Sequence, residues 1–569
     1  MTDEDLRARA AQAGIALTWR DQRGEDRAVS AETLRALLAA MGDGGAEGMV
    51  HRPLVTALAG EAIAMAGIAP GPVQIRDEEG RIHDVEAEAA GNRVALPGLP
   101  MGYHSVTDRS GATVTLAVAP QRCPTIRDTL GGRGWGPAVQ IYSLRTPGDG
   151  GIGTFGGVAA LGEAAARCGA DAITVSPVHA LFAAAPGHVS PYSPSTRLFI
   201  NPLHADPALV LPADTIARAI AEAGIGEVMD RLETLAEVDW LAATPVKRRL
   251  IAELHRLVAG DIAGADAAHA DFRAYRAQAS QDLQDHAVFE VLHGALVADG
   301  GPWHWRDWPE GYRSPRSAEV AAFAVDRLEA VEAEIFAQWL AERSRAEAQR
   351  RCREAGMRIG MIADLAIGVE GAGSQAWSHP ETMMRGISIG APPDYYSETG
   401  QSWGLTTFSP PGLVQDGFAG FIAMLRANLG AAGGLRIDHV MGLERLWMVP
   451  EGASATEGAY VAMPAEDLYR LTALEAHRHE AVIIGEDLGT LPYGYREALR
   501  DRGMAGMRVL RFERDGETHH PPEHWDADAI AMSSTHDMIA TAGWWRGADL
   551  EGEGSGRAQD RAVLWRSLQ

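Results

Sequence analysis

Four acidic residues stand at or just after the ends of short apolar runs in the sequence. They are Asp364 in MRIGMIADL, Asp438 in GGLRID, Glu486 in AVIIGED and Asp537, a few residues after AIAMSS. A carboxyl group can donate a proton, accept one or act as a nucleophile. A single aspartate in such a place is more often a helix cap or a turn residue. Four acids in equivalent positions instead favour a catalytic cluster.

Two basic residues lie close to these acids. Arg436 precedes Asp438 by two positions, and His536 directly precedes Asp537. Several carboxylates in one cleft are costly to keep ionised unless cations offset their charge. We therefore expect Arg436 and His536 to provide that charge.

The apolar runs are predicted to be buried parallel strands, because each is continuous and helical patterns lie between them. In an α/β barrel the catalytic groups project from the carboxyl ends of several strands, which is where the four acids stand. We see no internal repeat. The predicted strands cover seven ranges: 138–142, 172–176, 357–365, 433–438, 481–487, 507–512 and 530–534.

Two loops are rich in aromatic residues. The segment GAPPDYYSETGQSWG, 390–404, contains Tyr395, Tyr396 and Trp403, and the segment 188–207 contains Tyr192. Flat aromatic faces beside amides and hydroxyls suit sugar rings, which stack through their C–H faces and need hydrogen bonds. The alternative is that these aromatics only anchor surface loops to the body of the protein.

The chain is predicted to contain two domains. Residues 1–125 form an N-terminal α+β domain of two helices followed by a small antiparallel sheet, where Val73 and Ile75 alternate before a turn. A glycine-rich stretch at 123–137 marks the boundary. Residues 135–569 form the catalytic α/β domain, with a helical insertion at about 205–350.

Composition limits the possible partners. Lys and Arg number 51 against 76 Asp and Glu, a net charge of −25, which argues against nucleic acid or an anionic membrane surface. No run reaches the length of a membrane span, and the charged N-terminus shows no signal peptide. Three scattered cysteines indicate a reducing compartment. We therefore expect a cytoplasmic protein, with no metal site and no cofactor.

One motif suggests a different class. Gly151, Gly153 and Gly156 form a literal GxGxxG after a predicted strand and before a helix. A dinucleotide site also needs an acidic residue at the end of the following strand, but that strand ends in Ser176-Pro177. A nicotinamide-dependent oxidoreductase is therefore the last of the alternatives.

Several motifs together resemble one family. LRIDHVMGLERLW, IIGEDLG, STHD, GAPPDYYSETGQSWG and SPYSPSTRLFINPL together resemble the motifs of the 4-alpha-glucanotransferases, or amylomaltases, of the α-amylase clan. Each motif is short, but the ordered set is specific. The resemblance extends from about residue 130 to 545. The N-terminal part looks like the extra domain of the longer bacterial members.

The resemblance implies a (β/α)8 barrel and a retaining mechanism that transfers α-1,4-glucan segments between maltodextrins. It assigns Asp438 as the nucleophile, Glu486 as the acid/base and Asp537 as the carboxylate that stabilises the transition state. The residues implied to bind substrate are Arg436, His536, Asp364, Tyr192 and Trp403, and Tyr396 joins them from the aromatic loop.

Three departures from the family pattern stand out. His536-Asp537 is followed by Met538-Ile-Ala, Gly404 is followed by Leu-Thr-Thr, and no eighth strand is found after the seventh. Besides the transferase and the last-ranked oxidoreductase, the sequence therefore leaves two alternatives. One is an α-glucan hydrolase of the same clan, and the other is a glucan-binding protein without activity.

Overall fold

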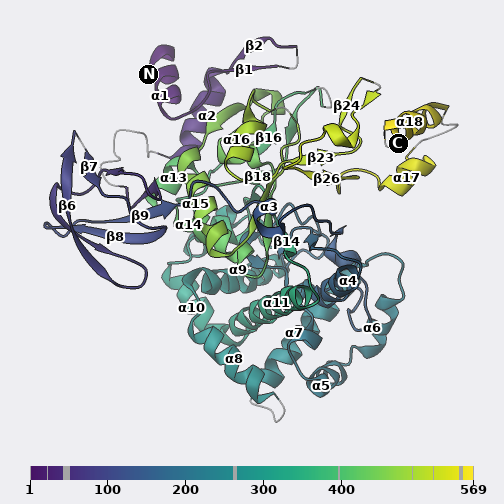
Figure 1. Cartoon of the computed structure of the whole chain (residues 1–569). Coiled ribbons are helices and arrows are strands. Elements are labelled where there is room, and N and C mark those ends of the chain that lie inside the picture. Colours follow the sequence, from purple (N-terminus) through teal and green to yellow (C-terminus); the bar gives the residue numbers. More distant parts are fainter. Residues whose placement is uncertain are drawn as a thin grey trace.

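The computed structural model describes most of the chain, and its elements are labelled in Figure 1. The described residues are 2–21, 23–42, 52–91, 93–260, 265–394, 397–489, 491–516, 518–549 and 555–567.

A five-stranded parallel sheet lies at the centre of the second domain, with the order β10-β11-β14-β19-β22. Every residue of the last three strands is buried, as expected for a sheet covered on both faces. The strands are β10 (Ala138–Val139), β11 (Ala172–Val175), β14 (Gly360–Leu365), β19 (Gly434–Ile437) and β22 (Val482–Gly485).

Two more strands continue the series. β23 (Met507–Val509) pairs in parallel with β26 (Ile530–Met532), and a parallel bridge between Ile484 and Ala505 connects this pair to β22. The seven predicted strands therefore occur in the predicted order. Within the described ranges, β10 and β26 each pair with a single strand, so the series stays open between them.

The first predicted strand, 138–142, is shorter than expected. Its regular pairing ends at Val139, and Ile141–Ser143 form a 3-10 helix. Ile141 is nevertheless fully buried in the core beneath the next helix. The apolar character of this run therefore reflects burial, and the backbone turns before the run ends.

Helices alternate with the strands and cover the sheet. They include α4 (Phe155–Arg167), α11 (Leu328–Glu354), α14 (Ala419–Leu429) and α15 (Ala465–Arg478). α4 and α11 pack closely. The space at Gly162 is so small that a Cβ atom there would lie only 2.4 Å from the sulfur of Cys352. Glycine at this position therefore sets the distance between the two helices.

The region between β13 (Thr196–Ile200) and β14 is helical and forms the lower body in Figure 1. Phe272, Phe336 and Trp339 pack together in its core, and Trp305 and Trp308 join a second aromatic cluster with Trp377. Besides α11, its helices are α5 (Ala213–Ala223), α6 (Gly226–Glu233), α7 (Trp240–Ala259), α8 (Asp266–Ala277), α9 (Gln281–Ala298) and α10 (Ala318–Asp326).

The first helices of the chain pack on the second domain. α1 (Asp3–Gln12) and α2 (Ala31–Met41) share a core with β16 (Ile387–Ala391), β20 (Arg445–Pro450) and β21 (Ala459–Ala462). A bridge between Ile15 and Val461 joins the two parts. These helices therefore support the strands that flank the 390–404 loop.

A seven-stranded sheet follows, in the order β3-β9-β8-β5-β6-β7-β4. Its edge strand β3 (Leu54–Leu58) runs parallel to β9 (Thr113–Ala119), so the sheet is mixed where a purely antiparallel one was expected. Thr56 donates a hydrogen bond to Asp467 and Tyr103 donates one to Glu475, which attaches the sheet to α15. The other strands are β5 (Gly71–Arg76), β6 (Ile82–Ala90), β7 (Arg93–Leu96), β8 (Gly102–Asp108) and, at the opposite edge, β4 (Ile63–Met65).

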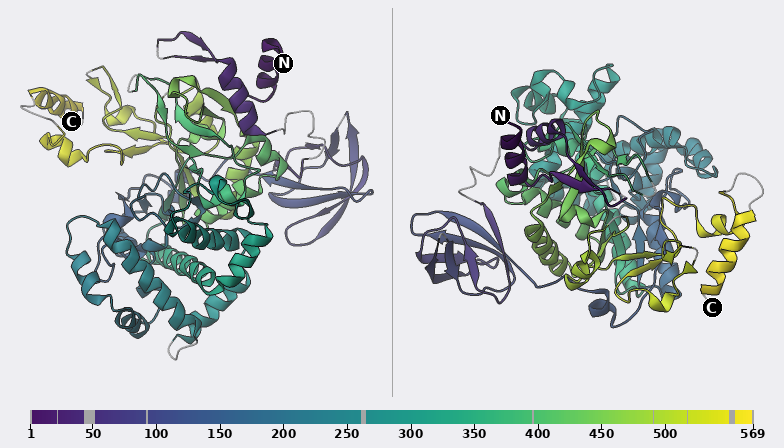
Figure 2. Two further views of the ribbon diagram at one scale, coloured as in Figure 1. Left: turned by 180° about the vertical axis from the view of Figure 1, so that it is seen from behind. Right: turned by 90° about the horizontal axis from the view of Figure 1, so that it is seen from above.

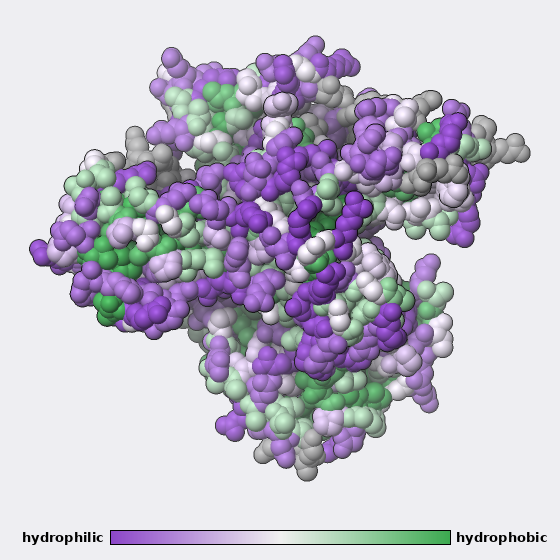
Figure 3. All heavy atoms as spheres, in the orientation of Figure 1, coloured by the Kyte–Doolittle hydropathy of each residue, from purple (hydrophilic) through white to green (hydrophobic). Residues whose placement is uncertain are grey.

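The N-terminal sheet and the C-terminal helices lie on opposite sides of the molecule. Figure 2 shows the sheet projecting from one side, and α17 (Thr541–Arg546) and α18 (Ser555–Ser567) from the other. Hydrophilic residues cover much of the face in Figure 3, and an apolar area lies over the N-terminal sheet. Among the described helices, none is both long and apolar enough to cross a membrane.

Candidate active site

The carboxyl ends of β14, β19 and β22 bring three of the predicted acids to one edge of the sheet. Asp364 is paired in register with Arg436, and Ile437 with Gly485. Backbone hydrogen bonds continue beyond the strands, from the Asp438 N–H to Leu365 and from the Glu486 N–H to Ile437. Asp438 and Glu486 therefore follow directly on two adjacent strands.

Arg436 connects two of these acids. Its guanidinium donates a hydrogen bond to Asp364 at 2.6 Å and forms an ion pair with Asp438 at 3.0 Å. Arg436 and Asp364 are both buried. Burial lowers the pKa of Arg436, but the two carboxylates outweigh it and the net shift is upward. The guanidinium therefore stays charged and provides the cation predicted from the sequence.

Asp438 occupies a site where burial and charge oppose each other. Burial, together with the negative charges of Asp364 and Glu486, raises the pKa of Asp438 to about 7, against the lowering effect of Arg436. Asp438 and Glu486 thus compete for a proton. Because Arg436 contacts Asp438 directly, a single proton is better placed on Glu486, which leaves Asp438 ionised.

Glu486 is buried and held by two backbone amides. The N–H groups of His439 and Leu488 donate to its two carboxyl oxygens at 2.9 and 2.7 Å. Burial raises the pKa of Glu486, Arg436 and these two amides lower it, and Asp487 raises it, with a net upward shift. The group therefore has a fixed orientation and an enhanced tendency to be protonated, which suits a general acid.

His439 follows Asp438 in the turn after β19. Its φ of 47° lies in the left-handed region, which is uncommon for residues other than glycine. This conformation accompanies the bond from its N–H to Glu486 and that from Val440 N–H to the Glu486 carbonyl. Burial lowers the pKa of the imidazole to about 4, so the ring is neutral near pH 7.

Asp487, next to Glu486, is fully buried and anchors the following strand. It accepts a hydrogen bond from the Met507 N–H at 2.6 Å and pairs with Arg508 at 3.0 Å and Arg496 at 3.1 Å. The sequence predicts no role for this residue. The only available signal was a second acid in the GED motif, and its partners come from distant segments.

Tyr192 joins the site from the 188–207 loop. Its hydroxyl donates to Asp364 at 2.7 Å and lies 3.2 Å from Nδ1 of His536. The two rings are stacked with centroids 4.4 Å apart. Burial and the charge of Asp364 raise the pKa of Tyr192, so the hydroxyl keeps its proton. Tyr192 thus links the centre of the site to the loop after β26.

Asp537 lies at the margin of the site. Its side chain is 79% exposed and pairs with Nε2 of His536 at 3.2 Å. This bond raises the pKa of His536 and lowers that of Asp537, so each favours the charged form of the other. A continuous series of contacts therefore runs from Asp438 through Arg436, Asp364, Tyr192 and His536 to Asp537.

Trp403 lies in the aromatic loop beside His439. Its indole meets the His439 ring edge to face, with centroids 5.5 Å apart, and its Nε1–H donates to Gln401 at 2.9 Å. β17 (Gln401–Ser402) pairs with β16 just before it. The other predicted residue of this loop, Tyr396, and its neighbour Tyr395 lie outside the described residues.

The GxGxxG glycines serve packing in this structure. A Cβ atom at Gly153 would lie 2.2 Å from the carbonyl oxygen of Ile141, and one at Gly151 would lie 2.9 Å from Leu232. The close approach of neighbouring chain therefore accounts for both glycines. Among the side chains that the structure describes, no group of three His, Cys, Asp or Glu residues is arranged to hold a metal ion.

Comparison with known proteins identifies the family. A family model described as 4-alpha-glucanotransferase matches residues 139–569, more than half of the chain. The chain belongs to this family. Among the similar curated members, the 4-alpha-glucanotransferase of Mycobacterium tuberculosis is 36% identical over 469 residues, covering 79% of this chain and 63% of that protein. That of Haemophilus influenzae is 33% identical over 476 residues, covering 80% and 67%.

The chain therefore spans less than two thirds of the length of its mycobacterial relatives. Among solved structures, amylomaltase from Corynebacterium glutamicum is similar with a TM-score of 0.83 and 26% identity, covering all of this chain and 86% of that one. Amylomaltase from Streptococcus agalactiae in complex with acarbose has a TM-score of 0.61 and 20% identity, covering 76% and 87%, a likeness in fold. The expected fold class, an α/β structure of the barrel type, is confirmed by the likeness to the Corynebacterium structure.

Proposed function

We propose that this protein is a retaining 4-alpha-glucanotransferase that moves α-1,4-glucan segments between maltodextrins through a covalent glycosyl-enzyme. The observation that carries the proposal is the contact of Arg436 with both Asp364 and Asp438, beside a buried Glu486. Membership of the family supports the same activity.

The positions of the two carboxyl groups favour retention of configuration. Asp438 and Glu486 follow residues that are paired in register on adjacent strands. Neighbouring strands lie about 4.8 Å apart. Retaining enzymes need their two carboxyl groups about 5–5.5 Å apart, whereas inverting enzymes need a wider gap to admit a water molecule. The strand geometry thus supports the retaining arrangement.

The proposed reaction has two steps. In the first, ionised Asp438 attacks the anomeric carbon while Glu486 gives its proton to the departing 4-oxygen, so one glycosidic bond breaks and one ester bond forms. In the second, Glu486 takes the proton of an incoming 4-hydroxyl, which displaces Asp438. Asp537 contributes negative charge to the oxocarbenium-like transition states. His536 pairs with Asp537, and Tyr192 stacks on His536, so the two residues position this carboxylate.

The proposed substrate-binding residues surround this centre. Arg436, Asp364 and Tyr192 are linked by hydrogen bonds at the strand ends, and Trp403 offers an indole beside the turn at His439. Tyr396 is proposed to join them on sequence grounds alone. Maltodextrins, and glycogen as a larger donor, are neutral, which suits a protein with a net charge of −25.

We also propose a cytoplasmic location and no cofactor. Cys123, Cys168 and Cys352 are all free, and free thiols are typical of a reducing compartment. The proposed chemistry uses only carboxyl groups of the chain and hydroxyl groups of the substrate.

Hydrolysis is the second candidate, because the side chain of Asp537 is 79% exposed and water can approach that side of the site. Incubation with maltotriose separates the candidates. A transferase produces glucose together with longer maltodextrins, whereas a hydrolase produces only shorter sugars. Binding without any product would support a glucan-binding protein. Formation of only shorter sugars, or binding without product, would contradict the proposed transferase.

A further inference from the structure

Arg197 is a buried cation without a counter-charge. It extends from β13, and only 3% of its surface is exposed. Four other arginines are equally buried, and each has a carboxylate nearby: Glu342 for Arg345, Asp364 and Asp438 for Arg436, Asp487 for Arg508 and Asp549 for Arg557. Arg197 forms no ion pair with any residue in the described ranges. A buried charge of this kind is strongly unfavourable unless something compensates it.

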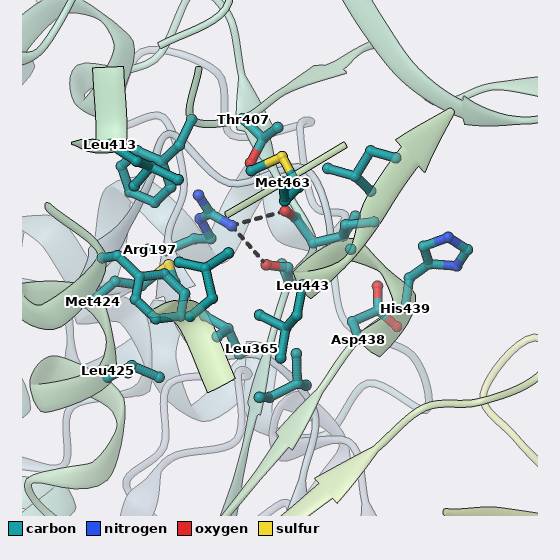
Figure 4. Close-up of a pocket in the computed structure, with 18 residues that line it drawn as sticks. Arg197, Leu365, Thr407, Leu413, Met424, Leu425, Asp438, His439, Leu443 and Met463 are labelled. Carbon is teal, nitrogen blue, oxygen red and sulfur yellow. Dashed lines mark hydrogen bonds between the residues drawn. The ribbon is translucent and has the colours of Figure 1, made fainter. Parts of the chain in front are cut away.

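The hydrogen bonds of Arg197 use only part of its guanidinium. Nη1 donates to the carbonyl oxygens of Ala366 and Ile367, drawn as dashed lines in Figure 4. Nε and Nη2 have no acceptor among the described residues. The neighbouring His179 does not compensate this charge, because burial and the charge of Arg197 lower the pKa of its imidazole to about 3 and the ring stays neutral.

The guanidinium borders a small cavity of about 50 Å³. Its walls are mostly apolar, including Leu413, Met424 and Leu425, and Thr407 contributes a hydroxyl that has no partner among the described residues. Asp438 and His439 form the far wall, and Figure 4 shows both at the edge of the group of side chains around Arg197. The cavity therefore lies directly behind the catalytic strand end.

These walls favour an anion over water. A buried water molecule needs two to four polar partners and must donate as well as accept. The cavity offers N–H donors at Arg197 and the hydroxyl of Thr407 among mostly apolar side chains, and its one carboxylate, Asp438, lies in the far wall and is paired with Arg436. A monatomic anion accepts from such donors, needs no acceptor of its own, and fits the volume. It also neutralises the buried guanidinium.

We propose that Arg197 and the cavity beside it bind a small monovalent anion of the size of chloride. The anion lies behind the loop that carries Asp438 and His439, and its binding stabilises the folded state. This inference does not rest on the proposed transferase reaction, since it is argued from the contacts of Arg197 and is tested without substrate.

Bromide provides a direct test, because it replaces chloride and is identified by its anomalous scattering. Crystals of the unaltered protein grown in sodium bromide should show an anomalous peak in contact with Nε and Nη2 of Arg197. A water molecule at this position, or no peak there while bromide appears elsewhere, would overturn the proposal. This experiment uses only the unaltered protein, so its outcome does not depend on whether a variant folds.

A solution experiment measures the same site. The Tm of the protein should be higher in sodium chloride than in sodium gluconate at equal ionic strength, by roughly 1–3 °C for a domain of this size. Arg197→Gln should abolish the difference, whereas Arg345→Gln, which removes a buried arginine that has a carboxylate neighbour, should keep it. Equal Tm values of the unaltered protein in the two salts, or a difference that survives Arg197→Gln, would contradict the proposal.

Discussion

Arg436 and Asp438, two residues apart at the end of β19, lie with guanidinium and carboxylate 3.0 Å from each other. Side chains at positions i and i+2 of a strand point to the same face, so the spacing itself brings the pair together. The same guanidinium reaches Asp364 on the neighbouring strand. One cation thus contacts both carboxylates, and its charge lowers the pKa of Asp438 against the effect of burial, which supports the proposed role of Asp438 as the nucleophile.

We predict that Asp438→Asn abolishes transfer while the protein stays folded. The amide is nearly isosteric but forms no glycosyl ester, so the rate should fall roughly a thousandfold or more. The rate of product formation from maltotriose and the Tm are the measurements. Asp515→Asn, at a side chain that is 91% exposed, is the control and should keep full activity. Near-normal transfer by a folded Asp438→Asn protein would exclude Asp438 as the nucleophile.

Asp487→Asn should shift the pH dependence of the reaction. Glu486 must be protonated to act as the acid, and the negative charge of Asp487 raises its pKa. Removing that charge lowers the pKa of Glu486, so the alkaline limb of kcat/KM should move to lower pH. Asp271→Asn removes the carboxylate that pairs with Arg343 in the helical region, and it should leave the limb unchanged. An alkaline limb at the same pH in Asp487→Asn would show that Asp487 has only a structural role.

Tyr192→Phe tests the connection between the strand ends and the loop that carries Asp537. The change removes the hydroxyl that contacts Asp364 and His536 and keeps the ring that stacks on the imidazole. A hydrogen bond to a charged group contributes about 1.5–3 kcal/mol, so kcat/KM should fall roughly tenfold to a hundredfold. Tyr142→Phe, which removes a hydroxyl bonded to Gln140, is the matched control. If both variants lose activity equally, the connection has no specific role.

Trp403→Ala should favour hydrolysis over transfer. If the indole stacks on the acceptor sugar, its loss removes roughly 1–3 kcal/mol of binding and lets water compete for the ester. The ratio of hydrolysis to transfer should then rise about fivefold to more than a hundredfold. Free glucose is measured against longer maltodextrins, with Trp403→Phe as a control that keeps an aromatic face. An unchanged ratio in Trp403→Ala would mean that the indole only supports the loop.

Much of the central sheet can be predicted from the sequence, because buried parallel strands appear as continuous apolar runs. The runs before Asp438 and Glu486 end where the strands end, so the meeting of these two acids follows from the topology. The run at 138–142 is misleading, since Ile141 is buried in a 3-10 helix and its apolar character does not report backbone conformation.

Other features depend on contacts that no local pattern reveals. Asp487 acquires its role from Arg508 and Arg496, which approach it only in the folded chain. No glycine in the sequence indicates the left-handed turn at His439. Arg197 appears in a motif with no acidic neighbour in sequence, and only the packing around it identifies it as an unpaired buried charge.

The most direct test of the proposed mechanism is to trap the covalent intermediate on Glu486→Gln. A maltosyl fluoride donor needs no proton from the enzyme, because fluoride leaves unaided, so ester formation should survive this change while resolution of the ester becomes slow. Mass spectrometry of the intact protein should show the addition of one maltosyl group, and peptide mapping should locate it on Asp438. An adduct on Asp364 or Asp537, or no adduct while fluoride is still released, would contradict the account.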